Sequence, residues 1–156
     1  MSAVLYRNAE EEDLEAVLKL WKQLDAFHHQ LGMSFPETED ASEKWQASFQ
    51  RTLGRFSYLW VAESDGNIGA FLLGRVKQSP AYLGGVQVGE ISDLMVSESL
   101  RGQGVGENLV RMAIEQFTAA KLHSVEVQIQ AGNDGGLEFW KEQGFDQDLT
   151  QVRKVL

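Results

Sequence analysis

The chain has 156 residues, of which 43% are hydrophobic and 24% charged, and its formal net charge at pH 7 is −9. This length predicts a single domain, 1–156, that buries enough surface for a self-supporting core. The acidic balance excludes a general electrostatic attraction to nucleic acid or to an anionic membrane surface.

The chain has no cysteine, which excludes disulfides, thiol nucleophiles and cysteine-ligated metal centres. No apolar run approaches the roughly 20 residues that a membrane-spanning helix needs. The N-terminal region turns acidic and lacks a basic segment followed by an apolar one. We therefore expect a cytoplasmic protein that has neither a membrane nor a nucleic acid as its partner.

Hydrophobic periodicity and turn residues predict the elements in chain order. A strand over 4–7 precedes helices that end near Gly32 and Gly54, strands over 58–62, 68–76 and 86–96, a helix over 104–120, a strand over 125–130, a helix over 133–142 and a strand over 151–156. The order is β-α-α-β-β-β-α-β-α-β, and Asp65-Gly66-Asn67 predicts a hairpin. Three consecutive strands argue against a doubly wound sheet. They favour an α/β fold whose mixed sheet is antiparallel first and parallel later, with helices on both faces.

A glycine-rich loop, Arg101–Gly106, lies between a predicted strand and a predicted helix. Glycines let the backbone approach an anion closely, and the start of a helix directs free N–H groups and a positive dipole end at it. The loop therefore predicts a phosphate or pyrophosphate cradle, and the alternative is a glycine turn without a ligand. No Gly-Lys-Ser/Thr follows, which excludes a P-loop, and the glycine spacing fails the dinucleotide fingerprint.

The loop resembles the acyl-CoA loop of the GNAT superfamily of N-acetyltransferases, whose pattern is Arg/Gln-x-x-Gly-x-Gly/Ala after a strand ending in Leu-x-Val. Leu94-Met95-Val96 supplies that strand end. Asn133 followed by Phe139-Trp140 and Gly144-Phe145 is similar to the family's Asn, Phe-Tyr and Gly-Phe segment. The opening Tyr6–Ala9 with Asp13 is similar to the family's first strand and helix. The likeness covers nearly the whole chain.

The resemblance implies a cleft where the strand before the loop separates from the next strand, with acetyl-CoA as co-substrate. We expect no metal, because His28, His29 and His123 are the only histidines and there is no cysteine. Backbone groups of the strand would pair with the pantetheine arm, and loop N–H groups would bind the pyrophosphate. The residues that the resemblance implies for binding acetyl-CoA are Leu94, Met95, Val96, Arg101, Gly102, Gln103, Gly104, Val105, Gly106, Asn133 and Trp140.

The reaction implied is direct attack of an amine on the thioester, which needs a group that removes the ammonium proton. In several family members a Glu at this offset before Leu-x-Val is the general base, and here that residue is Glu90. Strict alternation along the strand puts Glu90 on the same face as Leu94 and puts Asp93 on the opposite face. The alternative for Glu90 is a solvated strand carboxylate, and Asp93 could contact substrate or only orient the backbone.

Trp140 departs from the family, which usually has a Tyr there to protonate the departing thiolate. An indole N–H donates a hydrogen bond but is no acid near neutral pH. The thiolate is then protonated either by water or the product ammonium, or by another tyrosine, of which Tyr82 is the one free to reach the cleft. The simpler alternative is that Trp140 packs against CoA or the core and has no role in proton transfer. The other three tryptophans are most simply explained as core residues, and they are Trp21, Trp45 and Trp60. His28 is most simply explained as a buried, hydrogen-bonded imidazole.

These features favour an acetyl-CoA-dependent N-acetyltransferase that acts on a small-molecule or peptidyl primary amine. The acidic surface favours a cationic acceptor, and the resemblance is compatible with a homodimer. The second hypothesis is a non-catalytic acetyl-CoA-binding or interaction module, motivated by the missing Tyr. The third is a nucleotide-binding α/β protein.

Overall fold

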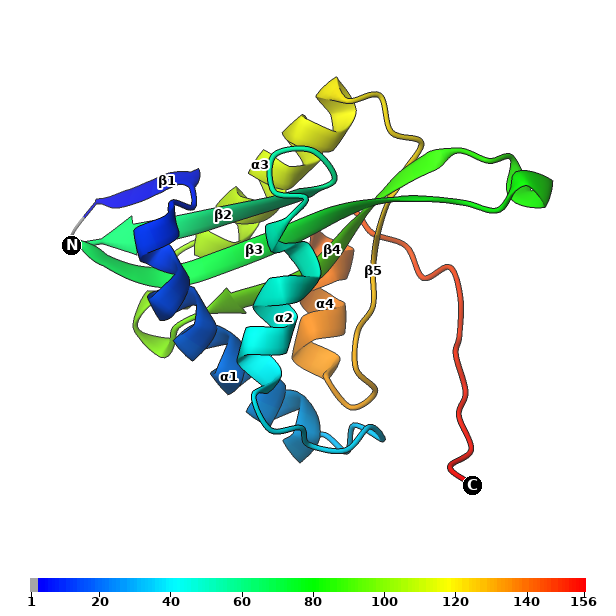
Figure 1. Ribbon diagram of the computed structural model, residues 1–156, viewed down its shortest axis with the longest axis horizontal. Helices are drawn as coiled ribbons and strands as arrows, with labels where there is room; N and C mark the ends of the chain where they lie inside the picture. The colour runs from blue at the N-terminus through cyan, green and yellow to red at the C-terminus, as the bar shows by residue number, and fades with distance from the viewer. Residues whose placement is uncertain (1–2) are drawn as a thin grey trace.

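The computed structural model describes residues 3–156 and contains one mixed sheet with the strand order β1-β2-β3-β4-β5 (Figure 1). Neighbours from β1 to β4 are antiparallel, and β4 and β5 are parallel, as the sequence predicts. The strands are β1 (Val4–Asn8), β2 (Ser57–Ser64), β3 (Asn67–Gln78), β4 (Gln87–Val96) and β5 (Val125–Val127). The helices are α1 (Leu14–Gln30), α2 (Ala41–Gln50), α3 (Val105–Ala119) and α4 (Asp134–Glu142).

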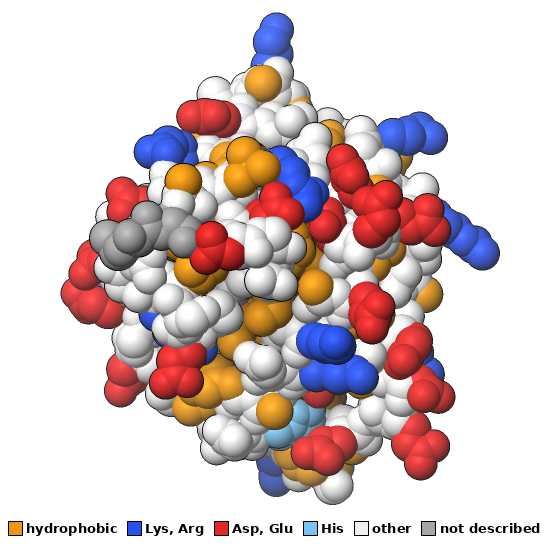
Figure 2. All heavy atoms as spheres, turned by 90° about the vertical axis from the view of Figure 1, so that its left-hand side faces the viewer, with side chains coloured by type: hydrophobic (Ala, Val, Ile, Leu, Met, Phe, Trp, Pro, Cys, Tyr) orange, Lys and Arg blue, Asp and Glu red, His pale blue; other side chains and the backbone are white. Residues whose placement is uncertain are grey.

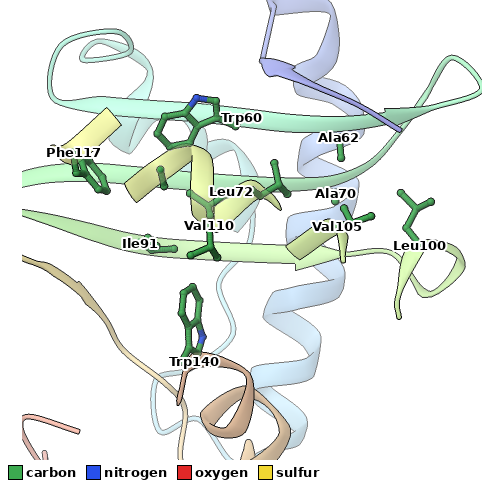
Figure 3. Close-up of a cluster of buried hydrophobic side chains, with 12 residues drawn as sticks. Trp60, Ala62, Ala70, Leu72, Ile91, Leu100, Val105, Val110, Phe117 and Trp140 are labelled. Carbon is green, nitrogen blue, oxygen red and sulfur yellow. The ribbon is translucent and has the colours of Figure 1, made fainter. Parts of the chain in front are cut away.

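Helices cover both faces of the sheet, with α1 and α2 across the near face in Figure 1 and α3 behind it. The α3 core joins Trp60, Leu72 and Ile91 of the sheet to Phe117 of α3 and Trp140 of α4 (Figure 3). The core on the α1–α2 face contains Val17, Leu20, Phe49, Leu59, Val61, Phe71, Leu73 and Met95. The helix predicted over 104–120 forms as α3, and its apolar stripe is buried at Val105, Leu109, Ala113 and Phe117 and partly buried at Met112.

The hairpin between β2 and β3 forms where the sequence predicts it. Asp65 and Gly66 have φ angles of 50° and 76°, and Ser64 pairs with Asn67. Two successive positive φ angles are the requirement of the tight turn that matches strand twist. The hairpin therefore follows from local sequence.

A β-bulge in β4 overturns the expected alternation of its side chains. Leu73 pairs with Asp93 and Gly74 with Ile91, so Ser92 has no partner residue on β3. A Cβ at Gly89 would lie 2.7 Å from the Phe117 ring of α3, so Gly89 faces α3 and Glu90 faces away from it. Because the extra residue reverses the alternation beyond it, Asp93 also turns toward α1 and α2. Glu90 and Asp93 thus share one face.

The expected closing strand over 151–156 does not form, and the regular elements end with α4. A strand needs a neighbour with free backbone groups, and the described chain gives residues 146–156 no backbone hydrogen bond. The guanidinium of Arg153 lies 4.6 Å from the ring centre of Phe35 in the loop between α1 and α2. The apolar side chains of this C-terminal tail are exposed, and they are Leu149, Val152, Val155 and Leu156.

On the face drawn in Figure 2, acidic and basic side chains are interspersed. Figure 2 shows acidic side chains around the rim of one face, with basic side chains between them and hydrophobic ones through the middle. Over residues 3–156, no helix is long and apolar enough to cross a bilayer. Within the same range, no group of three or more His, Asp or Glu side chains is placed to hold a metal ion.

Candidate active site

The sheet opens between β4 and β5. The two strands pair only where Gly89, Glu90 and Ile91 face Val125–Val127. Beyond this point β4 runs on to Val96 with β3 on one side, while the chain after β5 leaves the sheet. The edge of β4 that carries Leu94–Val96 therefore leaves backbone N–H and C=O groups available to an extended ligand, where the family resemblance implies the cleft.

The glycine loop follows β4 directly and leads into α3. Gly102 and Gly104 have φ angles of 78° and 76°, which side chains rarely adopt, and a Cβ at either would meet no atom within 4 Å. Arg101 Nε donates to the carbonyl of Val96 at 3.0 Å, which ties the loop back to the strand end. Gly104 is the N-cap of α3. The first N–H groups of α3 and its positive dipole end therefore face the open side of the loop, as an anion site requires.

The third glycine of the motif has a packing reason. A Cβ at Gly106 would lie 3.3 Å from the Phe139 ring of α4 and 3.6 Å from Val96. The contact with Phe139 would be tighter than most Cβ contacts, whereas the one with Val96 would be ordinary, so the absence of a side chain at Gly106 lets α3 approach Phe139 of α4. Gly106 thus positions the cradle through helix packing, whatever ligand the loop binds.

Asn133, which the family resemblance places beside the cofactor, is the N-cap of α4. Its Oδ1 accepts a hydrogen bond from the Gly136 N–H at 2.9 Å, and a Cβ at Gly136 would overlap the Asn133 amide. The glycine therefore makes room for the cap. The amide N–H₂ of Asn133 is the part of the side chain left for a ligand.

Trp140 is buried at 7% exposure and packs edge-on against two rings, with centroid distances of 5.1 Å to Phe139 and 5.1 Å to Phe145. Figure 3 shows its indole below Ile91 of β4. This arrangement favours the interpretation of Trp140 as a packing residue and gives it no role in proton transfer. Its indole belongs to the hydrophobic core on the α3 side of the sheet, next to β4.

Two of the three tyrosines have hydrogen-bond partners for their hydroxyl groups. Tyr6 Oη accepts from Asn108 Nδ2 at 3.1 Å, and Tyr58 Oη donates to a backbone carbonyl at 3.0 Å. Tyr82 is exposed, as expected. It lies beyond Gln87, in the turn at the end of β4 opposite the glycine loop, and the paired residues of β4 up to Ile91 separate it from the opening. That Tyr82 reaches the cleft stays a prediction.

Glu90 lies on the paired part of β4 and is held by a cation. Its Oε2 accepts from Lys77 Nζ at 3.0 Å, and the same ammonium contacts Glu126 on β5. These two carboxylates, Glu126 first, raise the pKa of Lys77. The Lys77 interaction is one that the sequence analysis missed, because the three residues come from three strands.

Asp93 lies where β4 and β5 have separated and is surrounded by donors from three elements. Its Oδ1 accepts from the indole N–H of Trp21 at 3.1 Å, and its Oδ2 accepts from the indole N–H of Trp45 at 3.2 Å. The Ser92 hydroxyl also donates to Oδ2, at 2.8 Å. The side chain is half-buried, and burial raises the pKa of its carboxyl despite these donors and Arg75.

The two tryptophans were expected only to fill the core. They do pack against it, with their rings stacked at 5.3 Å, and they also hold Asp93. A buried indole N–H usually finds an acceptor. That requirement was the one feature of the sequence that could have indicated a polar partner for these two tryptophans. The expected core role of Trp60 is confirmed.

A pocket of about 360 Å³ opens between α1, α2 and the loop joining them, with Trp21 in its wall. The pocket is strongly acidic, because its charged lining residues are Asp25, Glu37, Asp40 and Glu43 against Lys22.

His28 of α1 is half-buried. Burial lowers the pKa of its imidazole, although the charges of Asp93 and Asp25 act in the opposite direction.

The same arrangement of sheet, loop and helices occurs in known proteins. A crystal structure of a mutant protein from Bacillus halodurans matches with a TM-score of 0.83 at 25% identity, covering 97% of this chain and 99% of that one. An aminoglycoside acetyltransferase from an uncultured soil metagenomic sample, crystallised with sisomicin, matches in fold with a TM-score of 0.69 at 22% identity over 98% of this chain and 96% of that one.

Sequence comparison agrees with the structural likeness. An uncharacterized N-acetyltransferase of Methanocaldococcus jannaschii is 34% identical over 61 residues, which are 39% of this chain and only 27% of that relative. The model of the acetyltransferase (GNAT) family matches residues 21–145, a range that contains β4, β5, the glycine loop and α4. The chain therefore belongs to the acetyltransferase (GNAT) family.

Proposed function

We propose that the protein transfers the acetyl group of acetyl-CoA to the nitrogen of a primary amine. The observation that carries the proposal is the separation of β4 from β5 directly before a glycine loop that caps α3. The free edge of Leu94–Val96 would pair with the pantetheine arm. The N–H groups from Gln103 to Gly106 would bind the pyrophosphate, with Arg101 beside them.

The remaining candidate cofactor contacts are secondary in this proposal. Asn133 would use its amide N–H₂, since its oxygen caps α4. Trp140 would pack beneath the cofactor site and would not transfer a proton, because it is buried among aromatic rings. Binding through backbone groups explains how a chain with a net charge of −9 could hold an anionic cofactor.

The chemical difficulty is the proton of the acceptor. A lysine-like amine has a reference pKa near 10.4, so presenting it uncharged at neutral pH costs about 4.6 kcal/mol. A positioned carboxylate would contribute about 10²–10⁴-fold by taking that proton. Two carboxylates of β4 lie on the α1–α2 face of the sheet, where we place the acceptor. They are Glu90, which the family resemblance suggests as the base, and Asp93.

A cationic acceptor suits the α1–α2 face. The pocket there carries four carboxylates against one lysine, and a cleft lined by one sign of charge concentrates ligands of the opposite sign. The aminoglycoside acetyltransferase that shares the fold was crystallised with sisomicin. We infer a small acceptor with more than one ammonium group.

The second candidate is an acetyl-CoA-binding module without activity, and Trp140 in the usual Tyr position is the observation that favours it. Incubation of acetyl-CoA with a polyamine, an aminoglycoside, an amino acid and a lysine-containing peptide separates the two, with thiol release as the measurement. Amine-dependent thiol release supports the enzyme. Calorimetric binding of acetyl-CoA without release for any of the four supports the module, and absence of binding contradicts both.

A further inference from the structure

Resting on the proposed function, we propose that Asp93 is the carboxylate that takes the proton from the acceptor amine, and that Trp21 and Trp45 are positioning residues that hold it there. Asp93 is the β4 carboxylate beyond the point where β5 leaves. Glu90 lies before that point, where β5 still pairs and Lys77 already occupies its carboxylate.

The indoles fix the carboxylate from two sides. Trp21 reaches Oδ1 from α1, and Trp45 reaches Oδ2 from α2. Each ring is rigid and is itself held, since the two rings stack on each other and Trp45 packs edge-on against Phe49. Both oxygens of Asp93 therefore have defined positions before any acceptor arrives.

The hydrogen-bond count leaves room for one more donor. An ionised carboxylate has about four lone-pair sites, and Trp21, Trp45 and Ser92 fill three of them. An N–H of an incoming ammonium can take the fourth. Uncharged donors orient the carboxylate without supplying a full counter-charge, so it keeps its attraction for a cation.

The groups around Asp93 poise it to accept a proton. Burial disfavours its charged form and raises its pKa, which makes it a better base than an exposed Asp. The charged and titratable groups that face it are Arg75 of β3, which opposes this shift, and His28 of α1. Asp25 of α1 acts on the same histidine.

The proton and electron balance of the step is simple. The ammonium of the acceptor gives one proton to an Asp93 oxygen, and the freed nitrogen lone pair forms the C–N bond to the thioester carbonyl. The C–S bond then breaks and its electron pair leaves on the CoA sulfur. The proton that the nitrogen still carries in excess goes to that sulfur or to water, and Asp93 returns its own proton to solvent.

The test compares pH profiles of kcat/KM for acetyl-CoA and the most active amine of the four-member panel. Asp93→Asn is expected to lower turnover by about 10²–10⁴-fold and to remove the acid limb of the profile. Glu90→Gln is expected to retain that limb and to lose less. Acetyl-CoA affinity, measured by calorimetry, is expected to stay within a few-fold in both variants, which separates lost chemistry from lost folding.

Trp21→Phe and Trp45→Phe test positioning. Each keeps a ring and removes one N–H that stabilises the ionised carboxylate, so the acid limb is expected to move to higher pH. The matched control is Trp60→Phe, which changes a buried indole on the other face of the sheet. That control is expected to leave the limb in place.

A readout without turnover completes the test. Protonation of a carboxylate that binds two indoles changes their fluorescence, so the wild type is expected to show a fluorescence titration above the ordinary Asp pKa of about 3.9, absent in Asp93→Asn. A limb that persists in Asp93→Asn, or that Glu90→Gln removes instead, would overturn the inference and leave acetyl transfer standing. A wild type that binds acetyl-CoA but acetylates no amine would overturn both.

Discussion

The two sides of the β4–β5 opening are built by different means. On the α3 side, we propose that a contiguous loop of six residues binds the cofactor through backbone groups, and its glycines provide two positive φ angles and one close helix contact. On the α1–α2 side, the Asp93 arrangement depends on side chains 72 and 48 residues away in the chain. Backbone recognition is local and tolerates sequence change around it, whereas side-chain recognition depends on the packed fold.

The largest expected effect breaks the α3 side. Gly104→Val puts a branched side chain at a φ of 76° in the open part of the cradle, at a backbone cost of order 1–3 kcal/mol. We expect acetyl-CoA binding to become undetectable by calorimetry while circular dichroism stays native. Gly66→Val is the matched control, because Gly66 has the same φ and open surroundings in the β2–β3 hairpin. Equal acetyl-CoA affinity in the wild type and in Gly104→Val would contradict the proposal that this loop binds the pyrophosphate.

A second prediction contrasts Asp93 with another carboxylate near α1. Asp13 forms a bidentate pair with Arg7 at 2.6 and 3.0 Å, and that hydrogen bonding lowers the pKa of Asp13. A lowered folded-state pKa means that the stabilisation is complete above the unfolded pKa of about 3.9 and disappears as pH falls through the folded value. Asp13→Asn is expected to cost about 1.5–3 kcal/mol at pH 7.

Urea unfolding at pH 7 and at pH 3 checks this prediction. The difference between wild type and Asp13→Asn should shrink at the lower pH. Glu63→Gln, which removes the looser partner of Arg7 at 3.6 Å, serves as the comparison and should cost less. A difference that grows in acid would show that Arg7 is not what stabilises the ionised Asp13.

A third prediction concerns Trp140, which packs next to β4 on the α3 side of the sheet. Trp140→Tyr shortens a buried ring packed between Phe139 and Phe145, and packing losses of this kind cost about 1–3 kcal/mol. We expect a lower melting temperature, weaker acetyl-CoA binding and no gain in kcat. An increase in kcat at intact cofactor affinity would instead identify thiolate protonation as a limiting step.

The smallest effect is expected at the C-terminal tail. Removal of residues 149–156 eliminates the Arg153–Phe35 contact, and an exposed cation–π contact is worth about 0.5–1 kcal/mol. Arg153→Gln should reproduce most of the loss in chemical denaturation. A cost of several kcal/mol for the truncation would mean that these residues pack as the strand that their sequence suggests.

Much of the fold could be predicted from sequence because its signals are local. The Asp65-Gly66 turn, the four-residue stripe of α3 and the glycine loop each depend on neighbours within a few positions. The mixed sheet followed from the order of these elements and was confirmed. The family was identifiable for the same reason, since its motifs are short segments in a constant order.

The tertiary structure decided the features that depend on partners far apart in the chain. The register of β3 against β4 makes Ser92 a bulge, and this bulge turns Asp93 to the face of Glu90. The β-branched tail residues Val152 and Val155 favour an extended strand, yet the described chain supplies no hydrogen-bonding neighbour for them. The sequence by itself determined most local elements and the conformation of the glycine loop, because backbone conformation is set largely by adjacent residues. The environment of Asp93 required the packed fold, because indole donors from α1 and α2 meet β4 only after both helices are packed on the sheet.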